Sequence, residues 1–162
     1  MAYRNKTYVA FDGDRDMHYY NLMRAWRDNK GFSFNFFDAH DLNSARDSSL
    51  EYSIKNQLSE RMRNTKVFVL LIGESTQYLY RFVRWEIEQA LKRNLPIIAV
   101  NLNNKNGIDR NRCPAILRDE LALHIPFKQR AIEVALDDWP KQHDHYTRRG
   151  QAGPHYYNTL AV

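Results

Sequence analysis

Residues 66–72 decide the fold: they read KVFVLLI, a continuous apolar run after one lysine. A strand with one face in water alternates apolar and polar side chains, whereas a strand buried on both faces does not. The run is therefore typical of a central strand in a parallel sheet. Parallel strands need crossover connections, so we expect helices on both faces of this sheet.

Strands and helices alternate along the rest of the chain. Strand-like segments occupy residues 8–11, 32–37 and 96–102, with residues 121–127 as a candidate fifth strand. Between them, apolar residues recur at helical spacing over residues 19–26, 50–62, 79–93 and 132–139. This order predicts an α/β fold of the flavodoxin-like, doubly wound kind, with a five-stranded parallel sheet and right-handed crossovers.

The length of 162 residues suits one domain with one sizeable core. From His143 onward, turn-forming and aromatic residues follow one another without a period. We therefore expect a domain over residues 1–142. A C-terminal tail over residues 143–162 would pack on that domain or trail from it.

Composition excludes several classes of function. The net charge is +5, but the lysines and arginines are dispersed, which argues against a nucleic-acid partner. The single cysteine, Cys113, excludes an internal disulfide, and the histidines lack metal-ligand spacing. No signal peptide or membrane-spanning run occurs, so we expect a cytoplasmic protein with no membrane partner and no metal.

In a doubly wound sheet, ligands bind in the crevice at the carboxyl ends of the strands. The loops that begin at Asp12, Asp38 and Gly73 should meet there. Aromatic rings in this region could stack on a base, and charged side chains could contact ribose or phosphate; packing or solvation explains each equally well. The candidate ligand-contacting residues are Phe11, Asp12, Arg15, Phe37, Asp38, Ser75, Tyr78 and Phe82.

One glutamate lies on the apolar side of the helix expected over residues 79–93. Glu86 falls within the stripe of inward-facing residues, whereas Glu88 falls on the opposite, solvated side. A carboxylate on a half-buried face is costly without partners. Glu86 is therefore either paired with an arginine such as Arg15 or Arg46, or placed there to act on a ligand.

The sequence around Glu86 resembles a known box. Residues 82–87 read FVRWEI after the turn GESTQYLYR, similar to the Trp-Val-x-Trp-Glu-Ile box of bacterial TIR-like domains, with Phe82 in place of the first Trp. The start YVAFDGDRD at residues 8–16 and the segment FFDAHDLN at 36–43 resemble other parts of that family. The resemblance covers roughly residues 7–102. It is closest to the TIR-like branch of the Thoeris antiphage defence system.

The resemblance implies an activity. Catalytic TIR domains cleave the nicotinamide–ribose bond of NAD with the glutamate that Glu86 matches, and NAD is then a substrate rather than a cofactor. In the Thoeris system the product would be a cyclic ADP-ribose-type signal for a separate effector protein. Two alternatives stay open, a non-catalytic scaffold that acts through self-association as a homo-oligomer and a flavodoxin-like nucleotide-binding module. Glu86 favours the enzyme over the scaffold. The absence of a Gly-rich phosphate loop argues against the nucleotide-binding module.

Overall fold

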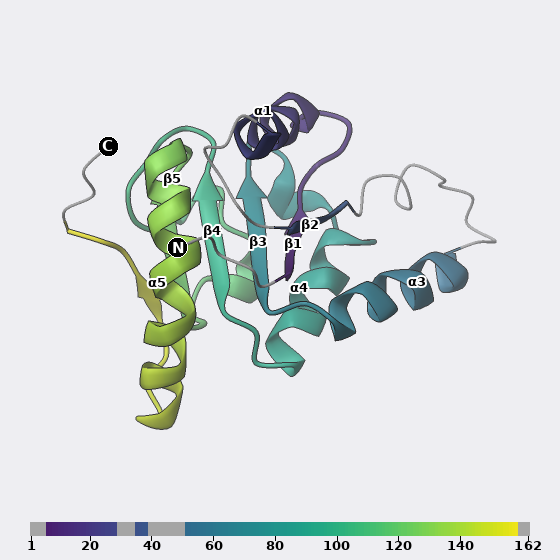
Figure 1. Ribbon diagram of the computed structural model, residues 1–162. Helices are drawn as coiled ribbons and strands as arrows, with labels where there is room; N and C mark the ends of the chain where they lie inside the picture. Colours follow the sequence, from purple (N-terminus) through teal and green to yellow (C-terminus); the bar gives the residue numbers. More distant parts are fainter. Residues whose placement is uncertain (1–5, 29–34, 39–50, 159–162) are drawn as a thin grey trace.

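One parallel sheet forms the centre of the computed structural model, which describes residues 6–28, 35–38 and 51–158. Within these residues the sheet has six strands in the order β2-β1-β3-β4-β5-β6, and every neighbouring pair is parallel (Figure 1). The strands are β1 (Lys6–Ala10), β2 (Asn35–Asp38), β3 (Val67–Ile72), β4 (Ile97–Asn101), β5 (Ala122–Pro126) and β6 (Pro154–His155).

The predicted fold class is confirmed. The KVFVLLI run forms β3, which lies between β1 and β4 in the interior of the sheet, and all six of its strand residues are buried. The five expected strands are present, although residues 32–34 of the second predicted segment lie outside the described part of the chain. The short β6 is an addition at the sheet edge, beside β5. A strand of two residues has no period that a sequence pattern could reveal.

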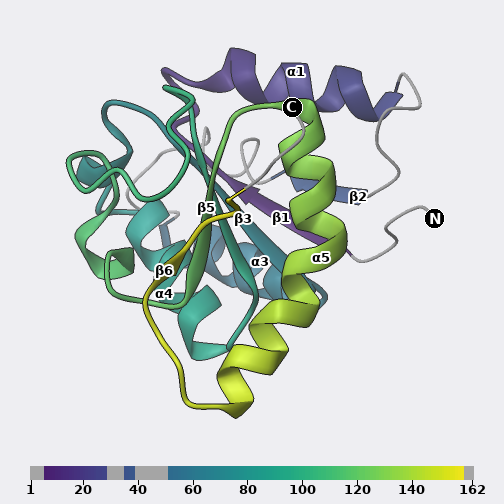
Figure 2. The same cartoon turned by 90° about the vertical axis from the view of Figure 1, so that its left-hand side faces the viewer.

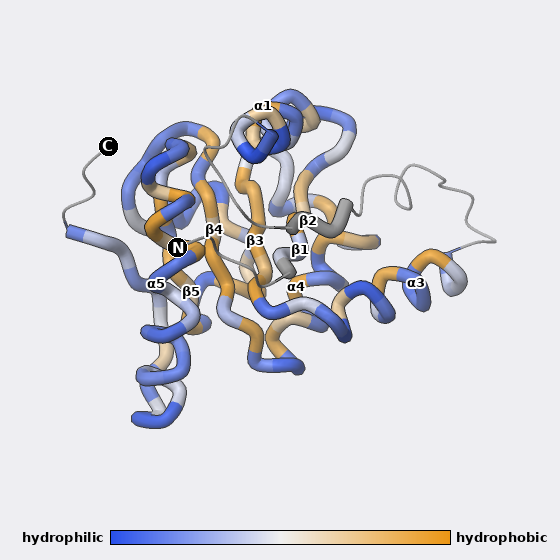
Figure 3. Tube along the Cα trace, in the orientation of Figure 1, coloured by the Kyte–Doolittle hydropathy of each residue, from blue (hydrophilic) through white to orange (hydrophobic). Residues whose placement is uncertain are grey.

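Helices cover both faces of the sheet, as doubly wound folds require (Figures 1 and 2). The helices are α1 (Met17–Asp28), α3 (Glu51–Arg63), α4 (Val83–Lys92) and α5 (Gln129–Arg148), with the short 3₁₀ helices η2 (Thr76–Tyr78) and η3 (Ala115–Leu117). Helices α1 and α5 pack on one face of the sheet and form one hydrophobic core with it. Helices α3, α4 and η3 pack on the opposite face and form a second core. The apolar strands between these helices stand out in Figure 3.

The helix that carries Glu86 begins later than the sequence predicts. We expected it from residue 79, but η2 comes first and Leu79 then adopts a non-helical backbone conformation (φ −89°, ψ 79°). Regular helix starts only at Val83. Apolar spacing alone could not reveal this break, because Leu79 and Phe82 both face inward in either arrangement. Glu86 therefore lies in the first turn of α4 rather than about two turns into a helix.

The last helix is longer than expected. α5 continues through Pro140 to Arg148, so the boundary that we expected at residue 142 falls inside a helix. His143 is buried, and one of its ring nitrogens contacts the carbonyl oxygen of Asn94 at 3.0 Å. Packing of this kind extends the helix past residue 142, and a periodic pattern in the sequence does not report it. No helix in the described ranges has the length and apolar character needed to cross a membrane.

Candidate active site

Glu86 is completely buried in the first turn of α4, with 0% of its surface exposed. The hydroxyl group of Tyr8 in β1 donates a hydrogen bond to Oε2 of Glu86. Tyr8 is also 0% exposed, and its ring stacks on Phe68 of β3 at a centroid distance of 5.6 Å. The Glu86 carboxylate is therefore hydrogen-bonded to the central part of the sheet through Tyr8, whose ring packs on the neighbouring strand.

Two features of the surroundings oppose the cost of a charge on Glu86. Burial and the neighbouring Glu86 carboxylate hold the pKa of Tyr8 well above its usual value, so Tyr8 remains a proton donor at neutral pH. The first turn of a helix also has a partial positive charge, which stabilises an acidic side chain. Together these two effects offset part of the cost of enclosing a carboxylate.

Tyr8 is the site residue that sequence reasoning missed. The sequence places Tyr8 only in a strand, and a tyrosine in a strand is usually a packing residue. One signal was available: Tyr8 and Ala10 lie on the same face of β1, the face that also receives α4. A buried tyrosine needs a partner for its hydroxyl group, so it should have been considered together with Glu86.

An aromatic cavity of about 180 Å³ lies next to the start of α4. It brings together three of the predicted ligand-contacting residues, Phe11 at the end of β1, Tyr78 in η2 and Phe82. The remaining lining residues are Leu79, Tyr80, Arg81 and Val83. Tyr78 is 62% exposed, whereas Phe11 and Phe82 are buried. The cavity is thus an apolar recess with an exposed tyrosine at its edge.

Glu86 lies one helical turn beyond this aromatic cavity. Its backbone N–H donates to the carbonyl oxygen of Phe82 at 2.8 Å. Side chains on a helix lean towards its N-terminus, which directs Glu86 towards the end of α4 that borders the cavity. None of the three cavities described in this section has Glu86 in its wall. The loop expected to complete the pocket, after Asp38, lies outside the described residues, so a pocket that opens onto Glu86 stays a prediction.

Asp12 and Ser75 hold two loops together. The hydroxyl group of Ser75 donates to Oδ2 of Asp12 at 2.7 Å, and the backbone N–H of Asp14 donates to Oδ1 at 3.0 Å. Asp12 is 3% exposed. This contact joins the loop after β1 to the loop after β3, as the crevice prediction requires. Direct contact of either residue with a ligand stays a prediction.

A second cavity, the switch-point cavity, has a volume of about 350 Å³. It lies beside the Asp12–Ser75 contact, where the ends of β1, β3 and β4 meet and the order of strands in the sheet reverses. Its lining residues are Arg15, Asp16, His18, Tyr19, Gly73, Glu74, Ser75, Leu102 and Arg112. Arg15, one of the arginines considered as a partner of Glu86, lines this cavity. The other, Arg46, lies outside the described residues.

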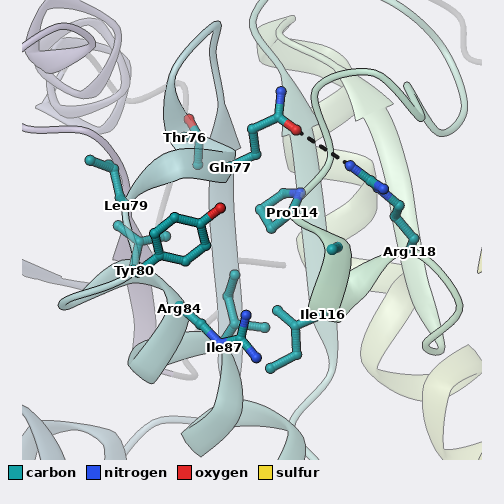
Figure 4. A pocket seen from close by; sticks show the side chains of 11 residues that line it. Thr76, Gln77, Leu79, Tyr80, Arg84, Ile87, Pro114, Ile116 and Arg118 are labelled. Atoms are coloured by element: carbon teal, nitrogen blue, oxygen red, sulfur yellow. Dashed lines mark hydrogen bonds between the residues drawn. The ribbon is translucent and has the colours of Figure 1, made fainter.

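A third cavity, of about 150 Å³, lies between η2, α4 and η3 (Figure 4). Arg118 donates to the side-chain oxygen of Gln77 at 3.3 Å across one side, and Ile87 and Ile116 line another. The side chains of Phe37 and Asp38 in β2 are not among those that the structure describes. Within the described residues, no group of three or more His, Cys, Asp or Glu side chains could hold a metal ion.

The family of the protein follows from a comparison with family models. Residues 8–107 match the model of the TIR-like domain of the Thoeris protein ThsB, and this range is more than half of the chain. The chain belongs to the ThsB TIR-like family. The resemblance drawn from residues 82–87 is thus confirmed, and the protein is a Thoeris-associated TIR-like protein. No curated protein matches the chain.

The match to the ThsB family includes Tyr8, Glu86 and the whole aromatic cavity. It ends at residue 107, before η3, β5, α5 and β6. Arg112 of the switch-point cavity therefore lies beyond the matched range. The candidate active site belongs to the family part of the chain, whereas one wall of the neighbouring cavity comes from outside it.

Proposed function

We propose that this ThsB-family protein cleaves the nicotinamide–ribose bond of NAD and converts the remaining nucleotide into a cyclic ADP-ribose-type signal. Glu86 is the catalytic residue, and the signal activates a separate Thoeris effector. One observation carries the proposal: a carboxylate with no exposed surface, hydrogen-bonded by a buried tyrosine, lies one turn from an aromatic cavity. Membership of the family supports it.

The chemistry needs one carboxylate. The C1′–N bond breaks and nicotinamide leaves as a neutral molecule with the bonding electron pair, so no general acid is required. The ribose is left as an oxocarbenium ion, and a negative charge beside it lowers the barrier. A carboxylate in a low-dielectric surrounding interacts with that cation more strongly than a solvated carboxylate does. Tyr8 holds Glu86 through Oε2 and fixes the orientation of the carboxylate group.

The enclosure of the site favours cyclisation over hydrolysis. The oxocarbenium ion is captured either by a nucleophilic group of the same nucleotide or by water, and each route releases one proton. A site that excludes water favours capture within the nucleotide. Both Glu86 and Tyr8 have no exposed surface, which is consistent with a dry site. The product is then a diffusible cyclic nucleotide rather than linear ADP-ribose.

The decisive experiment compares two glutamates on the same helix. Glu86→Gln keeps the shape of the side chain and removes its charge, and we expect NAD cleavage to fall by about 10²- to 10³-fold. Glu88→Gln is the matched control, because Glu88 is partly exposed and pairs with Arg84 at 3.2 Å. Cells that express wild type or either variant are challenged with phage, and their extracts are assayed for nicotinamide and for cyclic and linear products by mass spectrometry.

The outcomes separate the parts of the proposal. If Glu86→Gln cells make as much product as wild-type cells, the catalytic role of Glu86 is wrong. If only linear ADP-ribose accumulates and the filtrate does not activate the purified effector, the protein is an NAD hydrolase without a signalling product. Melting temperatures of the purified variants confirm that each is folded.

A non-catalytic scaffold is the alternative. Exposed tyrosines favour it, since tyrosine is enriched at protein interfaces. Tyr52, Tyr78 and Tyr80 are between 62% and 78% exposed. A scaffold predicts self-association without any loss of NAD in challenged cells, for the wild type and both variants alike.

A further inference from the structure

One carboxyl oxygen of a residue that lines the switch-point cavity has no hydrogen-bond partner in the described structure. Asp16 is 7% exposed, and its Oδ2 atom makes no hydrogen bond. The group packs against Gly73, where even a Cβ atom would lie 2.5 Å from Oδ2. A buried polar atom without a partner costs free energy. Asp16 is among the residues that line the cavity, so a ligand there can offer its carboxyl group a hydrogen bond.

Cations lie on the walls around this carboxyl group. Arg15 follows β1, and Arg112 reaches the cavity from the loop after β4, where it is 3.6 Å from the exposed Glu74. Burial, and then the nearby Asp12, raise the pKa of Asp16 above its usual value. A carboxyl group can accept a hydrogen bond from a ligand hydroxyl group. The arginines are suited to phosphate.

Aromatic side chains complete the cavity. Tyr19 and His18 lie on one wall, with ring centroids 4.1 Å apart. The volume of about 350 Å³ falls within the range of roughly 300–1,000 Å³ that is usual for small-molecule sites. The cavity therefore combines a hydrogen-bonding group for a hydroxyl, two cations for a phosphate and rings for a base. These are the three parts of a nucleoside phosphate.

We propose that the switch-point cavity binds the adenosine 5′-phosphate half of NAD. Asp16 bonds to a ribose hydroxyl, Arg15 and Arg112 bind the phosphate, and Tyr19 stacks on the base. Ser75 lines this cavity, and Phe11, which precedes Asp12 in the chain, lines the aromatic cavity. The nicotinamide half therefore extends past the Asp12–Ser75 contact towards Phe11 and Glu86. The choice of NAD rests on the proposed function, whereas the recognition of a nucleoside phosphate rests on the cavity alone.

The test measures the binding of AMP to the purified full chain by isothermal titration calorimetry. The two cations are removed in Arg15→Gln/Arg112→Gln, and the buried acceptor is removed in Asp16→Ala. The matched control is Arg27→Gln/Arg148→Gln, which changes the net charge equally at two positions that do not line the cavity. We expect both cavity variants to weaken AMP binding by about 10- to 100-fold, the loss expected for charge-assisted hydrogen bonds, and the control to match wild type. Inorganic phosphate and adenosine should each bind more weakly than AMP.

The outcomes distinguish the site from the chemistry. If wild type does not bind AMP, or binds it as tightly as Arg15→Gln/Arg112→Gln does, the proposed cavity function is wrong even if NAD is cleaved. If AMP binds, depends on these residues and is unaffected by Glu86→Gln, the cavity is a nucleoside-phosphate site. That result stands even when no nicotinamide is released, in which case the NAD-cleavage proposal alone fails. Melting temperatures of Asp16→Ala exclude loss of fold as the cause.

Discussion

The two faces of the sheet bury similar hydrophobic side chains but differ in the polar groups that they enclose. The face under α1 and α5 is packed with residues such as Leu136 and Trp139. The face under α3 and α4 also holds an apolar core, but Tyr8 and Glu86 meet within it. On that same side, β5 contributes His124, which is 0% exposed and alternates with Leu123 and Ile125 of the opposite core.

The difference separates the packing under α5, which serves stability, from the packing under α4, which encloses the candidate catalytic pair. Apolar packing contributes stability in proportion to the area removed from water. A buried carboxylate or imidazole reduces stability unless its partners compensate for lost hydration. Substitutions under α5 should therefore change stability and leave the activity of the folded protein intact. Substitutions under α4 should change activity or pH dependence more than packing would explain.

Leu136→Ala tests the packing under α5 and should have the largest effect on stability. Leu136 is 1% exposed in α5, and its truncation leaves a cavity in the core. We expect the free energy of unfolding to fall by about 2–5 kcal/mol, measured by urea denaturation. NAD cleavage per folded molecule should be unchanged. Leu22→Ala is the control. Leu22 on α1 is 44% exposed, so its truncation should lower the free energy of unfolding far less. A loss of activity in folded Leu136→Ala would contradict the division between the faces.

His124 should make the other face sensitive to acid. Neither ring nitrogen of His124 has a hydrogen-bond partner in the described residues, and burial lowers its pKa from 6.5 to about 4. The unfolded chain takes up a proton below about pH 6.5, whereas the folded protein does so only near pH 4, so stability is lost as the pH falls through this window. We expect a loss of about 2 kcal/mol between pH 7 and pH 5.

His124→Leu removes the group that titrates. Unfolding curves of this variant should show a smaller decrease in stability between pH 7 and pH 5 than wild type does. His143, whose pKa is also lowered by burial, remains in both proteins and contributes equally to both. Identical pH dependence in the two proteins would mean that His124 does not remain neutral in the folded state.

The sequence predicted the fold because the fold depends on patterns within single segments. KVFVLLI was recognisable as a central strand without reference to any other part of the chain, and the spacing around Ile87 placed Glu86 on the inward side of its helix. The pairing of Tyr8 with Glu86 joins residues 78 positions apart, and no local period records such a contact. Arg112 reaches its cavity from a loop that the sequence showed only as polar.

Tyr8→Phe tests whether the pair under α4 acts in the reaction. The variant keeps the ring that stacks on Phe68 and removes only the hydroxyl group that donates to Glu86. We expect kcat for NAD cleavage to fall by about tenfold with little change in KM, because the variant loses one hydrogen bond to a charged group. Without this donor the carboxyl group should protonate more readily, so the acid limb of the pH–rate profile should move to higher pH.

Tyr20→Phe is the control for that experiment. Tyr20 is also buried, at 1% exposure, but it lies in α1 on the opposite face and stacks on Phe11 at 4.7 Å. It should leave the pH–rate profile unchanged. If Tyr8→Phe shows the wild-type kcat and the wild-type profile, Tyr8 has a packing role only.

The smallest effect is expected at the edge of the sheet, where Tyr157 attaches the last segment to α5. Its hydroxyl group donates to Oδ2 of Asp138 at 2.7 Å, and burial together with this carboxylate raises the pKa of Tyr157. Tyr157→Phe should lower the free energy of unfolding by about 1 kcal/mol, and the melting temperature by roughly 2–4 °C. Tyr156→Phe, at a neighbouring position that is 58% exposed, should have no measurable effect. Amide hydrogen exchange should become faster at His155, the β6 residue that has an N–H group, and stay unchanged in β3, because β6 has only one neighbouring strand. A change in NAD cleavage in Tyr157→Phe would contradict the division between the faces, since it would link the α5 side to the site under α4.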